Sequence, residues 1–546
     1  MAAAQVETTT FVPHGAVWHY LDDGSDQGTS WTLPSFDDAG WTTGAAQLGY
    51  GDGDEATTIG FGPDPNNKFI TSYFRHTFEA TDASAYRQLM LRLVVDDGAL
   101  VWLNGVELAR TNLPIGAISA STTATLELAD AAETGDEWNF YHSWEVVLSG
   151  RPLLEGANVL AVEVHQATLA SPDLSFNLEL VASTERMRKG PYLIYPDDNT
   201  QMAVLWQTDE VSTCSIEWGM DLAYGTSSTI TTAYGADYQH AHMIDELDPG
   251  QLYFYRVSVR GDLYEGSFRA APAADAHAVK LLAYGDTRTN MVAHDRVCSG
   301  IVDVFRSDPA NQTLLLHVGD WSNAGGLEWS WSLEYFTRWW PNTREVQARL
   351  PIHGVRGNHE LLPNVFLKYW PYPYVMPHYW SFDYGPAHIA IVDQYTDYTS
   401  GSAQLTWLEG DLAASDKPWK IMVFHEPGWS AGQYFGNPYV RTELQPLCEK
   451  YGVQLVFAGH NHNYARALVN GVQHITTGGG GGPLTQPAAT DPNVVVVAVA
   501  FQFCQLEIEG NTLRFQALAP DGTVIDSFTI PSRNTTDVHR SAWELW

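Results

Sequence analysis

Five short apolar runs in the second half of the chain share one pattern, because each gives way to glycine or polar residues. The runs cover residues 281–284, 314–318, 352–356, 421–424 and 455–458. Short apolar runs separated by longer amphipathic stretches predict buried strands that alternate with helices in an open α/β sheet. Such sheets bind ligands at the carboxyl ends of their strands. The polar residues after the runs are therefore candidate site residues: Asp286, Asp320, Asn358 with His359, His425, and His460 with His462.

The pattern is different before residue 275, where polar and apolar residues alternate. Runs such as 87–95, 158–166 and 174–182 alternate in this way, and turn-forming residues separate them. This pattern is typical of β-sandwiches. We therefore predict two N-terminal all-β sandwiches, at 1–184 and 185–275, followed by an α/β sandwich with mixed sheets at 276–530 and a tail at 531–546. Within the third region, helices are predicted at 291–306, 328–347, 404–414 and 441–450.

Composition and charge narrow the range of partners. The 546 residues carry a net charge of −35. A surface this acidic repels polyanions, so we expect no nucleic-acid partner. The longest apolar run, 494–501, is too short to span a bilayer. Residues 1–10 lack the features of a signal peptide, and we expect an extracellular or periplasmic protein whose signal peptide has been removed. The four cysteines show no metal-ligand spacing, which favours buried thiols over a metal site.

The types of the candidate residues indicate metal chemistry. Carboxylates, an amide oxygen and imidazoles suit borderline divalent or trivalent ions. Gly-Asp, Gly-Asp, Gly-Asn-His-Glu, a single His and Gly-His-x-His follow one another at 285–286, 319–320, 357–360, 425 and 459–462. This series resembles that of the calcineurin-like metallophosphoesterases and is most similar to purple acid phosphatases. Residues 247–257 also resemble the late part of the fibronectin type III-like module that precedes the catalytic domain in that family.

The resemblance implies a dinuclear metal site and a hydrolytic reaction. It assigns one ion to Asp286, Asp320 and His462, and the other to Asp320, Asn358, His425 and His460, with Asp320 bridging. A metal-bound hydroxide would attack the phosphorus of a phosphate ester, and the ions would stabilise the developing charge. The resemblance therefore predicts a hydrolase of small phosphate esters, with phosphomonoesters favoured. A phosphodiesterase or a broader phosphate-ester hydrolase on the same site is the alternative.

Two positions depart from the family pattern, and both concern the first ion. Purple acid phosphatases have a tyrosine ligand for ferric iron three residues after the second aspartate, where this chain has Asn323. Related phosphoesterases have a histidine two residues after the first aspartate, where this chain has Arg288. We expect Asn323 to be a weak fourth ligand and the ions to be Zn, Mn, Fe(II) or Ca, because the phenolate that selects ferric iron is missing.

The remaining roles follow from side-chain chemistry beside the metals. Arg288 is expected to contact substrate phosphate, which its planar fork suits. His359 would protonate the leaving-group oxygen or stabilise its charge. The candidate substrate-binding residues are thus Arg288, Asn358 and His359, and the candidate catalytic residues are Asp320 and His359.

The first predicted sandwich has a resemblance of its own. Residues 96–105 resemble the hairpin of galactose-binding-like jelly-roll modules, and 31–50 resemble their opening. Tryptophans in such a module either stack on sugar rings or fill the core, and the core role is the more frequent one. Carbohydrate is therefore a candidate partner beside the phosphate ester. An alternative from another class is a carbohydrate- or surface-binding protein whose phosphatase domain has lost its activity.

Overall fold

The computed structural model describes residues 8–126, 142–148, 152–209, 212–228, 231–234, 237–375, 378–487 and 491–532. The chain divides into two compact units, Ala4–Arg186 and the part from Met187 onward. Apart from its first two residues, the predicted tail at 531–546 lies outside the described residues. Within the described residues, no helix is both long and apolar enough to cross a membrane.

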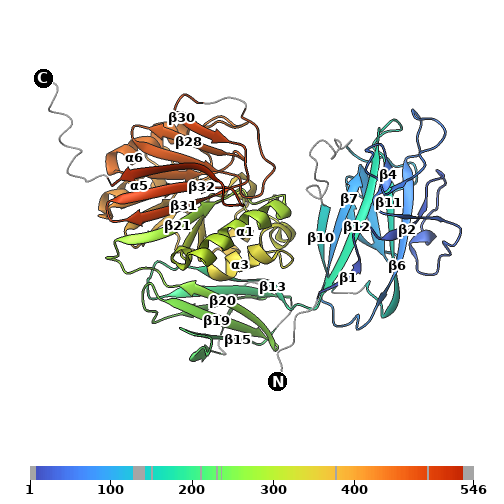
Figure 1. Ribbon diagram of the computed structural model, residues 1–546, viewed down its shortest axis with the longest axis horizontal. Coiled ribbons are helices and arrows are strands. Elements are labelled where there is room, and N and C mark those ends of the chain that lie inside the picture. The colour runs from blue at the N-terminus through green and yellow to red at the C-terminus, as the bar shows by residue number, and fades with distance from the viewer. Residues whose placement is uncertain are drawn as a thin grey trace. The chain divides into compact units, whose positions relative to one another are not determined.

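The first unit consists of two six-stranded sheets (Figure 1). One has the order β10–β7–β12–β4–β5, with β1 paired to β12, and its strands are β1 (Thr8–Val12), β4 (Leu48–Tyr50), β5 (Thr57–Thr58), β7 (Gln88–Asp96), β10 (His142–Val147) and β12 (Leu174–Ser183). The other has the order β3–β2–β6–β11–β8–β9, with strands β2 (Val17–Leu21), β3 (Thr42–Ala45), β6 (Thr71–Ala80), β8 (Gly98–Leu103), β9 (Val106–Thr111) and β11 (Gly156–His165). Phe74 from β6 stacks on Phe176 from β12 with ring centroids 4.2 Å apart. The two sheets therefore enclose a common core, which the alternating pattern predicts.

The second unit begins with two four-stranded antiparallel sheets. One has the order β13–β14–β18–β17, with strands β13 (Met187–Ile194), β14 (Met202–Thr208), β17 (Thr232–Tyr234) and β18 (Gln239–Ile244). The other has the order β16–β15–β19–β20, with strands β15 (Cys214–Gly219), β16 (Thr226–Ser228), β19 (Leu252–Val259) and β20 (Asp262–Arg269). Tyr192 donates its hydroxyl to the carbonyl of Tyr369 at 2.9 Å, and Tyr255 donates to the carbonyl of Ala348 at 2.9 Å. All of these groups are buried among residues of the following region, so the two parts share packing.

Two mixed sheets form the rest of the second unit. The first has the order β23–β22–β21–β31–β32–β33, with strands β21 (Ala278–Tyr284), β22 (Leu314–His317), β23 (Ile352–Gly354), β31 (Phe503–Glu509), β32 (Thr512–Leu518) and β33 (Val524–Pro531). The second has the order β24–β25–β26–β27–β29–β28–β30, with strands β24 (Trp380–Tyr384), β25 (Ala387–Ile391), β26 (Trp419–Val423), β27 (Leu455–Ala458), β28 (Tyr464–Val469), β29 (Val472–Thr477) and β30 (Val494–Ala498). Phe457 from β27 faces Phe515 from β32 with ring centroids 6.4 Å apart. The core therefore lies between these two sheets.

Helices cover the mixed sheets. They are α1 (Met291–Ser307), α2 (Glu328–Ser330), α3 (Pro341–Arg349), α4 (Asn364–Tyr369), α5 (Ala403–Ala414) and α6 (Gln445–Tyr451). Figure 1 shows α1 and α3 packed together beside the strands of the first mixed sheet. Leu408 of α5 and Leu447 of α6 pack with Met422 and Val456 on the second mixed sheet. The predicted fold class, N-terminal all-β sheets followed by an α/β region with mixed sheets, is confirmed.

One predicted helix is wrong. The pattern at 328–347 predicts a continuous helix, but the structure has α2, a wider π-helical turn at Trp331–Tyr335 and, after a break, α3. Trp340 is extended, with φ −114° and ψ 103°, and Pro341 begins α3. Proline lacks an N–H and disfavours helical geometry in the residue before it. The chain therefore leaves the helix before Trp340 and starts a new one at Pro341.

Candidate metal centre

All five predicted motifs follow the carboxyl ends of parallel strands. β21, β22 and β23 run parallel in the first mixed sheet, and β26 and β27 run parallel in the second. The loops after these strands bind one another: Asp286 N donates to the Gly319 carbonyl at 2.9 Å, and His460 N donates to Asp286 Oδ1 at 2.9 Å. The loops at the strand ends of the two sheets therefore form one cluster, and the predicted residues lie in it.

Three of the candidate ligands have left-handed backbones. The φ angles of Asp286, Asp320 and His460 are 57°, 54° and 69°. This region is unfavourable for residues other than glycine and is found at functional sites, where the surrounding structure maintains it. In each case the turn directs the side chain back toward the shared loop cluster.

Four side chains form one group of ligand atoms, which we call the second site: Asp320, Asn358, His425 and His460. His425 Nε2 lies 3.3 Å from Asp320 Oδ1 and 3.1 Å from Asn358 Oδ1. Asn358 Oδ1 also lies 2.9 Å from His460 Nδ1. The other ring nitrogen of His425 donates to the Val318 carbonyl at 2.8 Å, because a carbonyl oxygen can only accept.

This geometry fits a metal ion. With its Nδ1 proton engaged, His425 directs Nε2 at two oxygen atoms that are themselves acceptors, so Nε2 donates a proton to them in the charged ring and offers its lone pair to a cation in the neutral ring. A cation among these atoms satisfies all of them at once. Asp286, Asp320 and His425 also each offer a ligand atom within 4.8 Å of the other two. The nitrogen and oxygen donors of the second site suit a borderline divalent ion.

Asp286 and His462 lie beside the second site and belong to what we call the first site, together with Asp320 and Asn323. His462 Nε2 is 3.7 Å from Asp286 Oδ1. The Nδ1 atom of His462 donates to the Pro483 carbonyl at 2.8 Å, so Nε2 carries the lone pair in the neutral ring. Among the described residues, the buried Oδ2 atom of Asp286 has no hydrogen-bond partner.

Arg288 occupies the middle of the first site. Its Nε lies 3.2 Å from Asp320 Oδ2, one terminal nitrogen lies 3.3 Å from Asn323 Oδ1, and the other lies 3.2 Å from His462 Nε2. The guanidinium therefore contacts three of the four side chains predicted to hold the first ion. The ligand atoms of these three side chains are thus already paired with a cation, and Asp286 Oδ2 is the ligand atom of the first site that has no hydrogen-bond partner among the described residues.

Burial and charge set the protonation of the imidazoles. Burial lowers the pKa of His460 to about 3, and burial together with the charge of Arg288 lowers the pKa of His462 to about 4. Burial also opposes charge on His425, but Asp320 and Asp286 outweigh it and raise the pKa of His425 to about 10. His460 and His462 are therefore neutral near pH 7 and keep a lone pair for a cation, whereas His425 is charged near pH 7 when no ion is bound, and an ion would take the place of its Nε2 proton.

His359 lies at the rim of the site. Its Nδ1 donates to the Asn323 carbonyl at 2.6 Å, and its Nε2 lies 3.8 Å from Asp320 Oδ2. The side chain is 23% exposed. Burial lowers its pKa. His359 is thus within reach of the site and of solvent at the same time.

Two buried carboxylates that the sequence analysis did not assign organise these loops. Glu360 accepts four backbone N–H groups, from Asp320, Trp321, Ser322 and Gly357, at 2.8–3.2 Å. Glu334 accepts the N–H groups of Thr289 and Asn323 at 2.7 and 2.9 Å. Glu360 is part of the Gly-Asn-His-Glu motif, which could have identified it. Glu334 lies outside every motif.

Two glycines are required by close approach to the carboxylates. A Cβ atom on Gly357 would overlap Asp320 Oδ1, and one on Gly459 would overlap Asp286 Oδ2. A side chain at either position would push the carboxylate out of place. These glycines therefore belong to the motifs for a steric reason.

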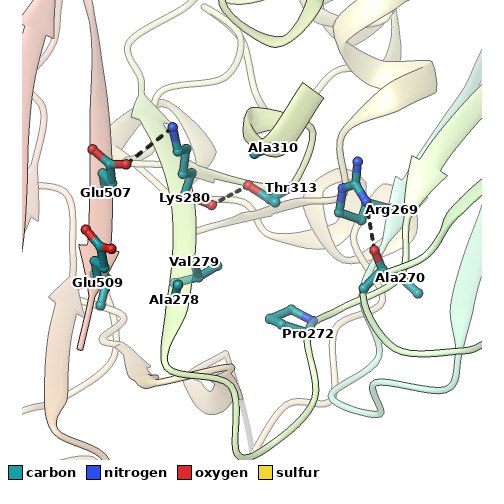
Figure 2. A pocket seen from close by; sticks show the side chains of 12 residues that line it. Arg269, Ala270, Pro272, Ala278, Val279, Lys280, Ala310, Thr313, Glu507 and Glu509 are labelled. Atoms are coloured by element: carbon teal, nitrogen blue, oxygen red, sulfur yellow. Dashed lines mark hydrogen bonds and ion pairs between the residues drawn. The ribbon is translucent and has the colours of Figure 1, made fainter. Parts of the chain in front are cut away.

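A separate cavity of about 470 Å³ lies at the opposite end of β21. Figure 2 shows its lining, with Val279 from the start of the strand directed toward Pro272 and Lys280 directed toward Glu507. Asp286 follows the other end of the same strand. This cavity has no candidate ligand group from the motifs, and it is not part of the metal centre.

Comparison with known proteins gives a match to a phosphoesterase family over the region that carries the motifs. Residues 274–464 match the family Calcineurin-like phosphoesterase. Purple acid phosphatase 23 of Arabidopsis thaliana is 28% identical over 291 residues, which are 44% of this chain and 62% of that protein. Probable inactive purple acid phosphatase 1 of the same plant is 27% identical over 364 residues, which are 55% of this chain and 59% of that protein. The match thus spans about three fifths of the length of these relatives.

A solved structure has the same fold. Purple acid phosphatase PPD1 from yellow lupin (Lupinus luteus) seeds has a TM-score of 0.59 at 19% identity, covering 86% of this chain and 94% of that chain. The family match, the strand-end motifs and this shared fold agree. Residues 274–464 therefore match the calcineurin-like phosphoesterase family, and the fold of the chain is similar to that of a purple acid phosphatase.

Proposed function

We propose that this chain is a metal-dependent phosphoesterase that hydrolyses small phosphate monoesters. The observation that carries the proposal is the second site, which consists of Asp320, Asn358, His425 and His460. Their neighbouring oxygen and nitrogen atoms lie 2.9–3.3 Å apart, close enough to bind one metal ion. Calcineurin-like phosphoesterases imply two divalent ions. The two donor sets of this chain are unequal, because Arg288 contacts three of the four residues of the first set but only Asp320 of the second.

A divalent ion, when bound, supplies a Lewis acid that polarises phosphoryl oxygens and lowers the pKa of water. The residues of the chain do the rest. Asp320 lies between the two sites, with one oxygen directed to His425 and the other to Arg288. Asp286, Asn323 and His462 complete the surroundings of the first site. We propose Zn, Mn, Fe(II) or Ca as the metal, with ferric iron disfavoured by Asn323.

Substrate binding and proton transfer are assigned to the rim. Arg288, Asn358 and His359 are proposed to hold the phosphate, because all three direct polar atoms toward the loop cluster. His359 is also proposed to protonate the leaving-group oxygen or stabilise its charge, and its position at the rim supports this role. Together with Asp320 it forms the proposed catalytic pair.

The test compares two aryl phosphates. After loading with Mn²⁺ or Zn²⁺, the protein should hydrolyse 4-nitrophenyl phosphate faster than bis(4-nitrophenyl) phosphate, and Asn358→Ala and His425→Ala should abolish both activities. The reverse preference would replace the monoesterase by the phosphodiesterase alternative. If the protein binds no metal and hydrolyses neither ester, the proposed enzymatic function is refuted.

A binding protein with an inactive phosphatase domain is the second candidate. It is supported by the guanidinium in the first site and by the name of the relative, probable inactive purple acid phosphatase 1. For the first unit, Trp31 and Tyr73 are buried with their rings 4.9 Å apart, which favours a core role over a sugar platform. Binding of the chain to immobilised polysaccharides without phosphatase activity would favour this candidate.

We also propose an extracellular or periplasmic location. The net charge of −35 supports it, because a net charge far from zero keeps a protein soluble outside the cell as well as inside it. Cell fractionation with an antibody against the chain tests it.

A further inference from the structure

The side chain of Arg288 makes contacts that a metal ion would otherwise make. Each of its three nitrogens lies 3.2–3.3 Å from a different candidate ligand of the first site, namely Asp320 Oδ2, Asn323 Oδ1 and His462 Nε2. A fourth contact joins a terminal nitrogen to Thr289 Oγ1 at 3.2 Å. A guanidinium has five N–H groups. Four of these five therefore have partners, and the side chain is 16% exposed.

The atoms that face Arg288 are all hydrogen-bond acceptors, as the N–H donors of a guanidinium require. His462 donates Nδ1–H to the Pro483 carbonyl, so Nε2 is an acceptor and receives an N–H from Arg288. Asp320 and Asn323 also contribute acceptor oxygens. The lone pairs of three of the four predicted ligands are thus used by one planar cation, whose fixed fork suits several acceptors at once.

The loop that carries Arg288 is held in place by a second group. Glu334 accepts the backbone N–H of Thr289 at 2.7 Å and that of Asn323 at 2.9 Å. Thr289 has a φ of 75°, an outlier for a β-branched residue. A buried carboxylate therefore fixes the residue after Arg288 and the partner Asn323 in one arrangement. Arg288 is not a loose surface side chain that happens to point inward.

We infer that Arg288 replaces the first metal ion of the dinuclear centre, so that this chain binds a single ion at the second site. The inference rests on the proposed metal-dependent function and specifies its cofactor content. It also explains why Asn323 stands in place of a phenolate ligand. A neutral amide oxygen is a suitable acceptor for a guanidinium, and no strong ligand is needed where no ion is held.

The replacement changes what the first site can do. A guanidinium donates hydrogen bonds and carries one positive charge, but it does not lower the pKa of water as a divalent ion does. The fifth N–H group of Arg288, which has no partner among the described residues, is the one left for a phosphate oxygen. The first site is therefore equipped to hold the substrate phosphate, in agreement with the predicted substrate-binding role of Arg288, and not to generate a nucleophile.

Metal stoichiometry of the full chain tests the inference. The protein is loaded with excess Mn²⁺, desalted, and measured by mass spectrometry for bound manganese and by electron paramagnetic resonance. We expect one ion per chain and the hyperfine pattern of an isolated Mn²⁺. Two ions about 3.5–4 Å apart, as in two-metal phosphatase sites, would instead give a coupled spectrum.

A variant makes the test specific to Arg288. Arg288→His removes the guanidinium and supplies an imidazole, and it should bind a second ion and show the coupled spectrum. Arg296→His is the matched control, because Arg296 is exposed on α1, and it should keep one ion.

The outcomes separate this inference from the proposed function. Two coupled ions in the wild-type protein would overturn the inference and leave the phosphoesterase in place. No bound ion would overturn both. If Arg288→His does not fold, the wild-type stoichiometry and spectrum still decide. If it folds and binds no second ion, Arg288 does not stand in the position of a metal.

Discussion

Glu360 binds the loops that carry the metal centre but is not itself a predicted ligand. Its loss should therefore show how much the support of these loops contributes to stability and to metal binding. Its Oε1 accepts the N–H groups of Trp321 and Ser322, and its Oε2 accepts those of Asp320 and Gly357. The carboxylate thus joins the loop after β22 to the loop after β23. The change Glu360→Gln keeps the size of the side chain and replaces one of the two oxygens by an NH₂ group.

The magnitude follows from the number of donors that lose an acceptor. In either orientation of the amide, two backbone N–H groups face an NH₂ group that cannot accept. A buried donor left without an acceptor costs about 1–3 kcal/mol. We therefore expect the free energy of unfolding to fall by about 2–6 kcal/mol. Because the loops carry Asp320 and Asn358, the affinity for a metal ion should also fall by about 10–100-fold, as it does when groups behind metal ligands are lost.

Urea unfolding followed by circular dichroism, together with calorimetric titration of Mn²⁺, measures both effects. The midpoint of unfolding should shift without a change in slope, which is the sign of a change in stability alone. Glu409→Gln is the matched control: Glu409 pairs with Lys450 at 2.7 Å on the surface, and an exposed pair of this kind contributes about 0–1 kcal/mol.

Two results would refute the reasoning. An equal shift of the midpoint in Glu360→Gln and Glu409→Gln would mean that the four N–H contacts do not stabilise the loops. A large loss of stability with unchanged Mn²⁺ affinity in the folded protein would mean that Glu360 supports the fold but does not position Asp320 and Asn358.

Three other side chains give predictions of different kinds. Burial opposes charge on His388, but Asp383 and Asp411, each within 2.9 Å, outweigh it and raise the pKa of His388 to about 9. The charge of His388 should therefore stabilise the fold by about 3 kcal/mol below about pH 6.5. This stabilisation should be lost as the pH rises through 9. Melting temperatures of wild type and His388→Gln should therefore differ most near pH 6 and converge above about pH 10, and a constant difference would contradict this origin. His359→Gln should slow hydrolysis of an alkyl phosphate at least about 10-fold more than that of 4-nitrophenyl phosphate, because a poor leaving group needs the proton more; equal losses would remove the proton-donor role. Tyr434 lies with its ring centroid 4.3 Å from that of His460 and is 45% exposed. Tyr434→Ala should therefore raise KM for aryl phosphates about 5–10-fold, while Tyr434→Phe should leave KM unchanged. An unchanged KM in both variants would show that the ring does not contact substrate.

The position of the metal centre could be predicted because sheet geometry is regular. A short apolar run becomes a buried strand, parallel strands end at one edge, and the residue after each run is therefore placed by the sheet. Asp286, Asp320 and His425 follow this rule directly. Their meeting point required no knowledge of side-chain conformation.

The contacts of Arg288 and Glu334 could not be predicted in this way. The direction of Arg288 depends on the left-handed backbones of Asp286 and Thr289, which leave no mark in a pattern of polar and apolar residues. Glu334 binds Thr289 and Asn323 across sequence separations of 45 and 11 residues. The sequence pattern around Glu334 also predicts one long helix. The position of Glu334 depends instead on the break before Pro341 and on the wider turn at Trp331–Tyr335.

The hydroxyl groups of Tyr192 and Tyr255 have a consequence for how such a chain can change during evolution. They bind backbone carbonyls of Tyr369 and Ala348, deep in the neighbouring region. Exchange of the paired four-stranded sheets for another module would leave buried carbonyls without donors and a gap where two aromatic rings had been. Recombination at the junction near residue 275 would thus be selected against, and everything from Met187 onward would be inherited as a single block.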